Sequence, residues 1–100
     1  MTKYKVNFDK RAKEEYTYWK EKKPENAERI KALIKDIKRS HFKGLGKPEA
    51  LKHDMQGYWS REITTEHRLV YRIRVMVEND EKYTEIIIAS CRYHYKKHRK

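Results

Sequence analysis

The sequence has one cysteine, two prolines and three glycines among its 100 residues. Because Cys91 is the single cysteine, no disulfide can form within the chain, which fits a reducing compartment. No stretch approaches the run of about 18 apolar residues that a membrane-spanning helix needs. The N-terminus, MTKYKVNFDKR, lacks the apolar core of a signal peptide. We therefore expect a cytoplasmic protein with no membrane attachment.

Motifs that would hold a metal or a nucleotide are also missing. The segment GLGK at residues 44–47 is shorter than a phosphate-binding P-loop and lacks its Ser or Thr. Cys91 has no partner that would make it a nucleophile, so we interpret it as a core residue. No pair of histidines has a recognised metal-ligand spacing; they stand at His41, His53, His67, His94 and His98. We expect no metal and no cofactor.

Positive charge, by contrast, is abundant. The chain has 26 Lys and Arg residues against 15 Asp and Glu, a formal net charge of +11 at pH 7. Such a charge favours nucleic acid, an acidic protein or an anionic membrane surface as partner. Aromatic rings among cations suit RNA, because a ring can stack on a base while the cations hold phosphates. The alternative is that the rings are core, which is our interpretation of Trp19 and Trp59.

The apolar pattern predicts one strand and two helices in the first 40 residues. Alternating apolar residues over 4–8 indicate a half-buried strand. Asp9 can cap a helix over 10–23, and Pro24 is suited to the first position of a second helix, which should end near 39–40. The two helices should form an antiparallel pair. Neither has a basic face opposite a large apolar one, which argues against a membrane-surface protein.

The remaining sequence reads as a loop followed by strands. All three glycines lie between residues 41 and 57, so this stretch is expected to be loop, with a short strand around 50–52. Three strands follow, in YWSREI, HRLVYRIRVMV and YTEIIIASCRY. The element order is therefore β-α-α-(β)-β-β-β. A single domain over 1–95 is expected, followed by a basic tail over 96–100.

The last two predicted strands are expected to form a hairpin with its turn at 78–81. If Val77 pairs with Tyr83, Arg68 lies opposite Arg92, and His94 lies diagonally from Arg68 on the same face. This register keeps the apolar residues together, and a slip of one residue would separate them. The pairs that it predicts are Leu69 with Cys91, Tyr71 with Ala89 and Ile73 with Ile87.

In the strand predicted over HRLVYRIRVMV, apolar residues at odd-numbered positions from 69 to 77 alternate with largely cationic ones at even-numbered positions, so one face is apolar and the other basic. This basic face and the loop beside it carry residue types that RNA cleavage requires. A base takes the proton from the 2′-OH, a cation stabilises the phosphorane, and an acid protonates the leaving 5′ oxygen. Arginine suits bidentate phosphate contact, and histidine can be the acid near pH 7. The candidates are Glu49, Lys52, Arg61, Arg68, Arg92, His94 and Tyr95. In so basic a chain, a solvated strand face is an equally good interpretation.

Several stretches together resemble the YoeB/Txe family of bacterial toxins, within the RelE-like superfamily. The order GKPE, LKH, GYWSR, ITTEHRLVY and CRYHY carries the resemblance, between residues 33 and 95. The resemblance implies an α+β domain with two helices packed on a curved, mainly antiparallel sheet. It also implies an endoribonuclease that cuts mRNA in the ribosomal A site, a cognate antitoxin, and a monomer or homodimer.

By position, the resemblance implies a role for each matching residue. Glu49 of KPE would be the general base, Arg68 of EHRLVY would stabilise charge at the scissile phosphate, and His94 of RYHY would be the general acid. Tyr95 would position the substrate. The reaction would use no metal and leave a 2′,3′-cyclic phosphate and a 5′-hydroxyl. The other expected RNA contacts are Lys52, Arg61, Arg92, Lys96 and Lys97.

The sequence departs from the family pattern at three places. Glu62 stands where the family commonly has a basic residue, the chain continues past RYHY through Lys96–Lys100, and the last hairpin is long enough to predict a protruding tip at 79–81. A non-catalytic RNA- or ribosome-binding module, such as a decayed toxin, is the alternative function. The intact set of Glu49, Arg68 and His94–Tyr95 argues against decay.

Overall fold

The computed structural model describes residues 3–93. Its elements follow the predicted order, and the chain is an α+β domain. They are β1 (Tyr4–Phe8), α1 (Lys10–Lys22), α2 (Pro24–Arg39), β2 (Glu49–Ala50), the short 3₁₀ helix η1 (His53–Met55), β3 (Trp59–Glu62), β4 (Arg68–Glu78) and β5 (Glu81–Ser90). The 3₁₀ helix is the one element in this part of the chain that the sequence pattern did not predict.

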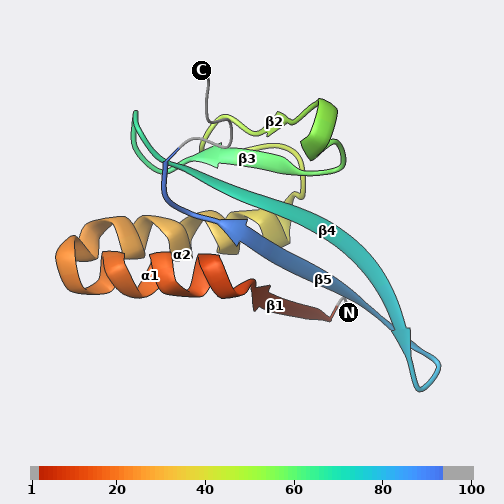
Figure 1. Cartoon of the computed structure of the whole chain (residues 1–100). Coiled ribbons are helices and arrows are strands. Elements are labelled where there is room, and N and C mark those ends of the chain that lie inside the picture. The colour runs from red at the N-terminus through yellow and green to blue at the C-terminus, as the bar shows by residue number, and fades with distance from the viewer. Residues whose placement is uncertain (1–2, 94–100) are drawn as a thin grey trace.

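The five strands form one mixed sheet in the order β1-β5-β4-β3-β2. β1 runs parallel to β5, and the other neighbours are antiparallel. Figure 1 shows the two helices side by side against the sheet, while β4 and β5 curve away together to a distant tip. The predicted curved, mainly antiparallel sheet with two packed helices is confirmed.

The helix boundaries follow from local sequence. Asp9 occupies the N-cap of α1, although its side chain makes no capping hydrogen bond there. Pro24 is the first residue of α2, where its missing N–H is harmless, and the helix ends at Arg39 as predicted. A single residue, Lys23, joins the helices, so they are held as a close pair.

The core lies between the helices and the sheet. Ile30, Leu33 and Ile37 of α2 are fully buried against apolar residues of β4 and β5. Each such side chain contributes about 1.5–3 kcal/mol when removed from water. Trp19 is also buried, and its Nε1 donates a 2.8 Å hydrogen bond to the carbonyl of Cys91. None of the helices in residues 3–93 is long and apolar enough to cross a membrane.

Cys91 is a core residue, as predicted. Its thiol is fully buried, and this burial, with a smaller contribution from Glu15, raises the pKa of Cys91 to about 12. At neutral pH almost no thiolate is present, and the thiolate is the reactive form. The side chain therefore has the chemistry of a small apolar residue.

The predicted register of the last hairpin is wrong over most of its length. Val77 pairs with Lys82 rather than Tyr83, and Ile73 pairs with Ile86 rather than Ile87. The reason is the turn: Asn79 and Asp80 both have positive φ, 54° and 65°, as in a two-residue type I′ turn. This tight turn pairs Glu78 directly with Glu81 and so fixes the register.

A bulge restores the predicted register near the site. Val70 pairs with Ser90, whereas Tyr71 pairs with Ile88, so Ala89 is an extra residue on β5. A bulge of this kind locally increases twist and bends the strand. The pairing of Val70 with Ser90 is the one that the predicted register requires. Because β5 ends at Ser90, the predicted pairs of Leu69 with Cys91 and of Arg68 with Arg92 are not part of the strand pairing.

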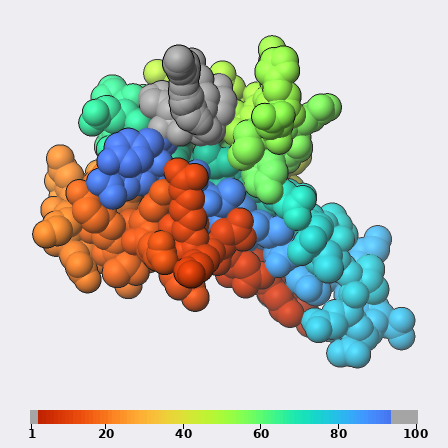
Figure 2. Space-filling view, in the orientation of Figure 1, coloured from red at the N-terminus to blue at the C-terminus, as the bar shows by residue number. Residues whose placement is uncertain are grey.

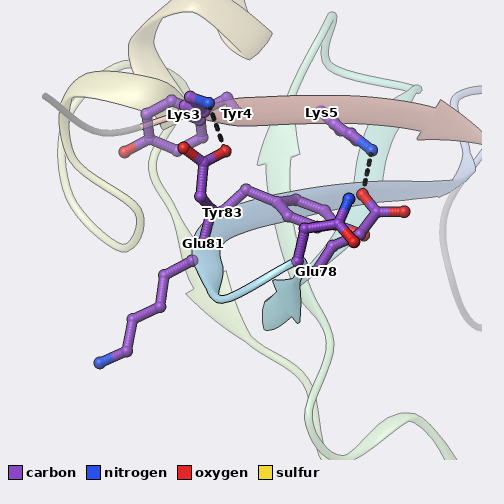
Figure 3. Close-up of a pocket in the computed structure, with 8 residues that line it drawn as sticks. Lys3, Tyr4, Lys5, Glu78, Glu81 and Tyr83 are labelled. Carbon is purple, nitrogen blue, oxygen red and sulfur yellow. Dashed lines mark hydrogen bonds and ion pairs between the residues drawn. The ribbon is translucent and has the colours of Figure 1, made fainter.

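The hairpin tip projects beyond the body of the molecule, as predicted (Figure 2). Val75 and Val77, expected on the apolar face, are 64% and 65% exposed because the tip extends past the packed core. Figure 3 shows how the N-terminal segment is tied to this tip by two ion pairs, Lys3 with Glu81 at 2.7 Å and Lys5 with Glu78 at 3.1 Å. Exposed pairs of this kind contribute little to stability.

Candidate active site

Three neighbouring strands bring Glu49 and Arg68 together. Glu49 of β2 pairs with Ser60 of β3, and Arg68 begins β4 on the other side of β3. The side chains reach across β3, so that Arg68 Nη2 lies 3.8 Å from Glu49 Oε1. A carboxylate and a guanidinium separated in the sequence thus form one site.

The guanidinium of Arg68 is held in a fixed position. Its Nε donates a 2.8 Å hydrogen bond to Ser60 Oγ, and its Nη2 donates to the carbonyls of Lys47 at 3.0 Å and Ser60 at 3.3 Å. The side chain is 12% exposed. Among the described residues, Nη1 takes part in no hydrogen bond. A fixed cation with an unused donor edge is suited to a phosphate oxygen.

Glu49 is accessible, in contrast to its arginine partner. Its side chain is 59% exposed, and β2 is the edge strand of the sheet. Lys52 follows β2 and is also exposed. A general base must reach the proton that it removes, and Glu49 meets that requirement.

Arg61 is not a surface residue, and the prediction that it contacts RNA is wrong. Its side chain is fully buried. Its guanidinium donates 2.7 Å hydrogen bonds to Asp36 Oδ2 and to the carbonyl of Ser40, and its Nε donates a 3.1 Å bond to the hydroxyl of Tyr71. With its donors engaged inside the protein, this arginine cannot bind a phosphate.

The buried guanidinium instead organises the loop that follows α2. Further hydrogen bonds run from Arg61 to the carbonyls of His41, Lys43 and Leu45. The backbone N–H of Leu45 donates to Asp36 Oδ2. The hydrogen bond from this N–H, and to a smaller extent the one from Arg61, holds the pKa of Asp36 below its ordinary value of 3.8. The loop leads directly to Lys47, whose carbonyl holds Arg68, so Arg61 supports the site indirectly.

Arg92 stacks on aromatic rings at the end of β5. Its guanidinium carbon lies 3.8 Å from the ring centroid of Tyr18 and 4.8 Å from that of Tyr93. Its buried Nε has no hydrogen-bond partner among residues 3–93. Cation–π contacts of this kind contribute about 0.5–2 kcal/mol. An RNA contact by Arg92 stays a prediction, beside this structural role.

Four predicted residues, His94, Tyr95, Lys96 and Lys97, lie outside the described residues. The diagonal from Arg68 to His94 is therefore not described either. The last described residue, Tyr93, accepts a 3.2 Å hydrogen bond at its carbonyl from the backbone N–H of Arg68. The backbone immediately before His94 is thus joined to the first residue of β4.

The sequence interpretation missed two groups that hold Arg68. Ser60 supplies both its hydroxyl and its carbonyl, and Lys47 supplies its carbonyl. The position of Ser60 inside WSR was a signal, whereas a backbone carbonyl leaves no signal in a sequence. Glu62, at the usually basic position, lies 3.9 Å from Lys47 Nζ, so its charge is partly offset. No three potential metal-ligating side chains gather anywhere between residues 3 and 93.

The known sequences that match this chain are bacterial toxins. Residues 8–95 match the model of the YoeB-like toxin family of bacterial type II toxin–antitoxin systems. Toxin YoeB of Escherichia coli strain K12 is 44% identical over 91 residues, which cover 91% of this chain and 99% of that protein. Toxin YoeB of Streptomyces coelicolor is 43% identical over the same share of both chains.

Solved structures show the same fold. A YoeB/ParE toxin from Agrobacterium tumefaciens has a TM-score of 0.80 at 42% identity and covers 91% of this chain and 99% of its own. YoeB from Staphylococcus aureus, solved as a dimer, has a TM-score of 0.78 at 39% identity, covering 94% of this chain and 100% of its own. With its family match, its relatives and its fold in agreement, this chain belongs to the YoeB-like toxins of bacterial type II toxin–antitoxin systems.

Proposed function

We propose that this toxin is an endoribonuclease that cuts mRNA in the A site of the translating ribosome. The observation that carries the proposal is the pairing of an exposed carboxylate, Glu49, with a fixed arginine, Arg68, at 3.8 Å. One group can remove a proton, and the other can stabilise a phosphorane without moving.

In the proposed reaction, Glu49 removes the proton from the 2′-OH, and the 2′ oxygen attacks the adjacent phosphorus. The bond from phosphorus to the 5′ oxygen breaks, and His94 gives its proton to that leaving oxygen. Arg68 binds the non-bridging oxygens while their negative charge develops. The products are a 2′,3′-cyclic phosphate and a 5′-hydroxyl, and no metal or cofactor takes part.

His94 and Tyr95 enter the proposal from the family motif, as general acid and as a residue that positions the substrate. The structure gives this assignment indirect support. The carbonyl of Tyr93, the residue directly before His94, is bonded to the backbone of Arg68. The sequence therefore continues into the RYHY histidine from a point adjacent to the phosphate-binding arginine.

The proposed partners are mRNA, the ribosome and a cognate antitoxin, in the cytoplasm. The net charge of +11 supports docking on ribosomal RNA and binding of an acidic antitoxin segment. Lys52, Lys96 and Lys97 would contribute to that docking. A toxin from Staphylococcus aureus at 39% identity is known in a YoeB–YefM complex and as a dimer, so an antitoxin complex and either a monomer or a homodimer fit this chain.

Glu49→Gln should lower single-turnover cleavage of ribosome-bound mRNA by a factor of at least about 100, because the amide cannot accept the 2′-OH proton. Glu81→Gln is the matched control: Glu81 is similarly exposed, at 65% against 59%, but lies at the hairpin tip. The control should cleave at the wild-type rate. Full activity of Glu49→Gln would show that another group is the base.

The same assay distinguishes the enzyme from a non-catalytic binding module. A binding module would give no cleavage with any variant. It would bind the ribosome in proportion to its charge, and its affinity would fall with salt at a log–log slope of about −0.7 for each single-stranded phosphate contact.

A further inference from the structure

His67 joins three separate parts of the fold immediately before Arg68. Its Nδ1 accepts a 2.7 Å hydrogen bond from the backbone N–H of Tyr93, at the end of the segment that follows β5. Its ring centroid lies 4.8 Å from that of Trp19 on α1 and 5.3 Å from that of Tyr93. The side chain is 12% exposed.

The backbone of His67 is itself fixed by a tight turn. Its carbonyl accepts hydrogen bonds from the N–H groups of Ile63, at 2.8 Å, and Thr64, at 3.1 Å. The hydroxyl of Thr64 accepts a 3.1 Å hydrogen bond from the N–H of His67. With backbone and ring both held, the imidazole presents Nδ1 to Tyr93 in a constant direction.

Tyr93 has an unfavourable backbone conformation that requires such support. Its φ is +67°, in the left-handed region that residues other than glycine rarely adopt. A strained conformation of this kind persists only where the surroundings fix it. Here the N–H of Tyr93 is bound by His67. The carbonyl of Tyr93 accepts a 3.2 Å hydrogen bond from the backbone N–H of Arg68, the residue that follows His67.

The hydrogen bond also identifies the ring nitrogen that acts as acceptor. A backbone N–H can only donate, so Nδ1 accepts this hydrogen bond and carries no proton of its own. Glu66 Oε1 lies 3.9 Å from Nε2. His67 therefore acts on Tyr93 as a hydrogen-bond acceptor through Nδ1.

We propose that His67 is a positioning residue whose Nδ1 holds Tyr93 in its left-handed conformation and so sets the backbone from which the catalytic histidine follows. The inference rests on the proposed function, in which His94 is the general acid. In this account His67 touches no reacting atom and acts through the main chain of Tyr93.

Two substitutions of His67 distinguish the effect of its hydrogen-bond acceptor from the effect of its ring packing. Asparagine places its Oδ1 where Nδ1 stands and keeps the acceptor, whereas phenylalanine keeps a ring against Trp19 and loses the acceptor. The Tyr93 amide is near the surface, so in His67→Phe water can bond it, and the loss of stability should be small. Each variant is first checked by thermal unfolding.

The experiment combines amide hydrogen exchange at Tyr93 with single-turnover cleavage of ribosome-bound mRNA. In His67→Phe we expect the Tyr93 amide to exchange at least about 10-fold faster, and the cleavage rate to fall about 10-fold or more with ribosome affinity unchanged, since small misplacements of a catalytic group have effects of this size. In His67→Asn both quantities should stay within about 3-fold of wild type.

Other outcomes overturn the inference. Unchanged exchange at Tyr93 in His67→Phe would show that Nδ1 does not hold the amide, and faster exchange with unchanged cleavage would remove the positioning role. Equal impairment of the two variants would assign the effect to ring packing. A wild-type protein that cleaves no RNA would refute the proposed function instead, and exchange at Tyr93 alone would then decide whether His67 fixes this backbone.

Discussion

Arg68→Ala is expected to lower the rate of mRNA cleavage by a factor of at least about 100 while leaving ribosome affinity close to that of the wild type. The guanidinium is held by Ser60 and by the carbonyl of Lys47 before the substrate arrives. A preorganised charge of this kind stabilises the phosphorane more than the bound RNA, so its loss falls on the chemical step. Single-turnover cleavage at saturating ribosome concentration measures that step.

Arg68→Lys and Arg74→Ala are the matched controls. The lysine keeps the charge but loses the fork of donors, so it should recover only part of the rate. Arg74 lies on the same strand but is 46% exposed and paired with Glu85 at 2.7 Å, and its loss should leave cleavage unchanged. If Arg68→Ala cleaves within about 3-fold of wild type, the proposed site is wrong.

Arg61→Ala is expected to lower the free energy of unfolding by at least about 3 kcal/mol, because removing one partner of a buried charge network leaves the others unpaired. In this case the carbonyls of Ser40 and Leu45 lose the guanidinium as donor, and Asp36 keeps only the N–H of Leu45. Small domains have a total margin of only about 5–15 kcal/mol. Urea denaturation followed by tryptophan fluorescence gives the difference between the variant and the wild type.

Arg74→Ala again provides the comparison, since exposed ion pairs contribute at most about 1 kcal/mol. It should unfold nearly as the wild type does. If Arg61 bound RNA directly, Arg61→Ala would instead leave the stability unchanged and weaken ribosome binding. That result would contradict the buried network.

The elements of the fold could be predicted because each has a local cause. Apolar spacing on α2 and the proline at its first position set that helix, and alternation set β1. The hairpin register could not be predicted, because two tertiary details decide it. One is the two-residue turn at Asn79 and Asp80, and the other is the bulge at Ala89. Neither changes the apolar pattern.

The site was only partly predictable for the same physical reason. Glu49 and Arg68 lie in family motifs, and the strand order brings them together. Arg61 also lies in a motif, but its burial depends on the loop after α2 folding back over it, and that loop has no periodic pattern. In so basic a chain, a structural arginine and an RNA-binding arginine have the same signature. Only their burial separates them.

Primer extension on an mRNA, with purified toxin in the presence and absence of translating ribosomes, tests the central claim most directly. We expect cuts within the A-site codon that require the ribosome and disappear in Arg68→Ala and His94→Ala. Ribosome binding should persist in both variants. Wild-type protein that binds ribosomes but leaves the mRNA intact would contradict the claim and support a binding module without nuclease activity.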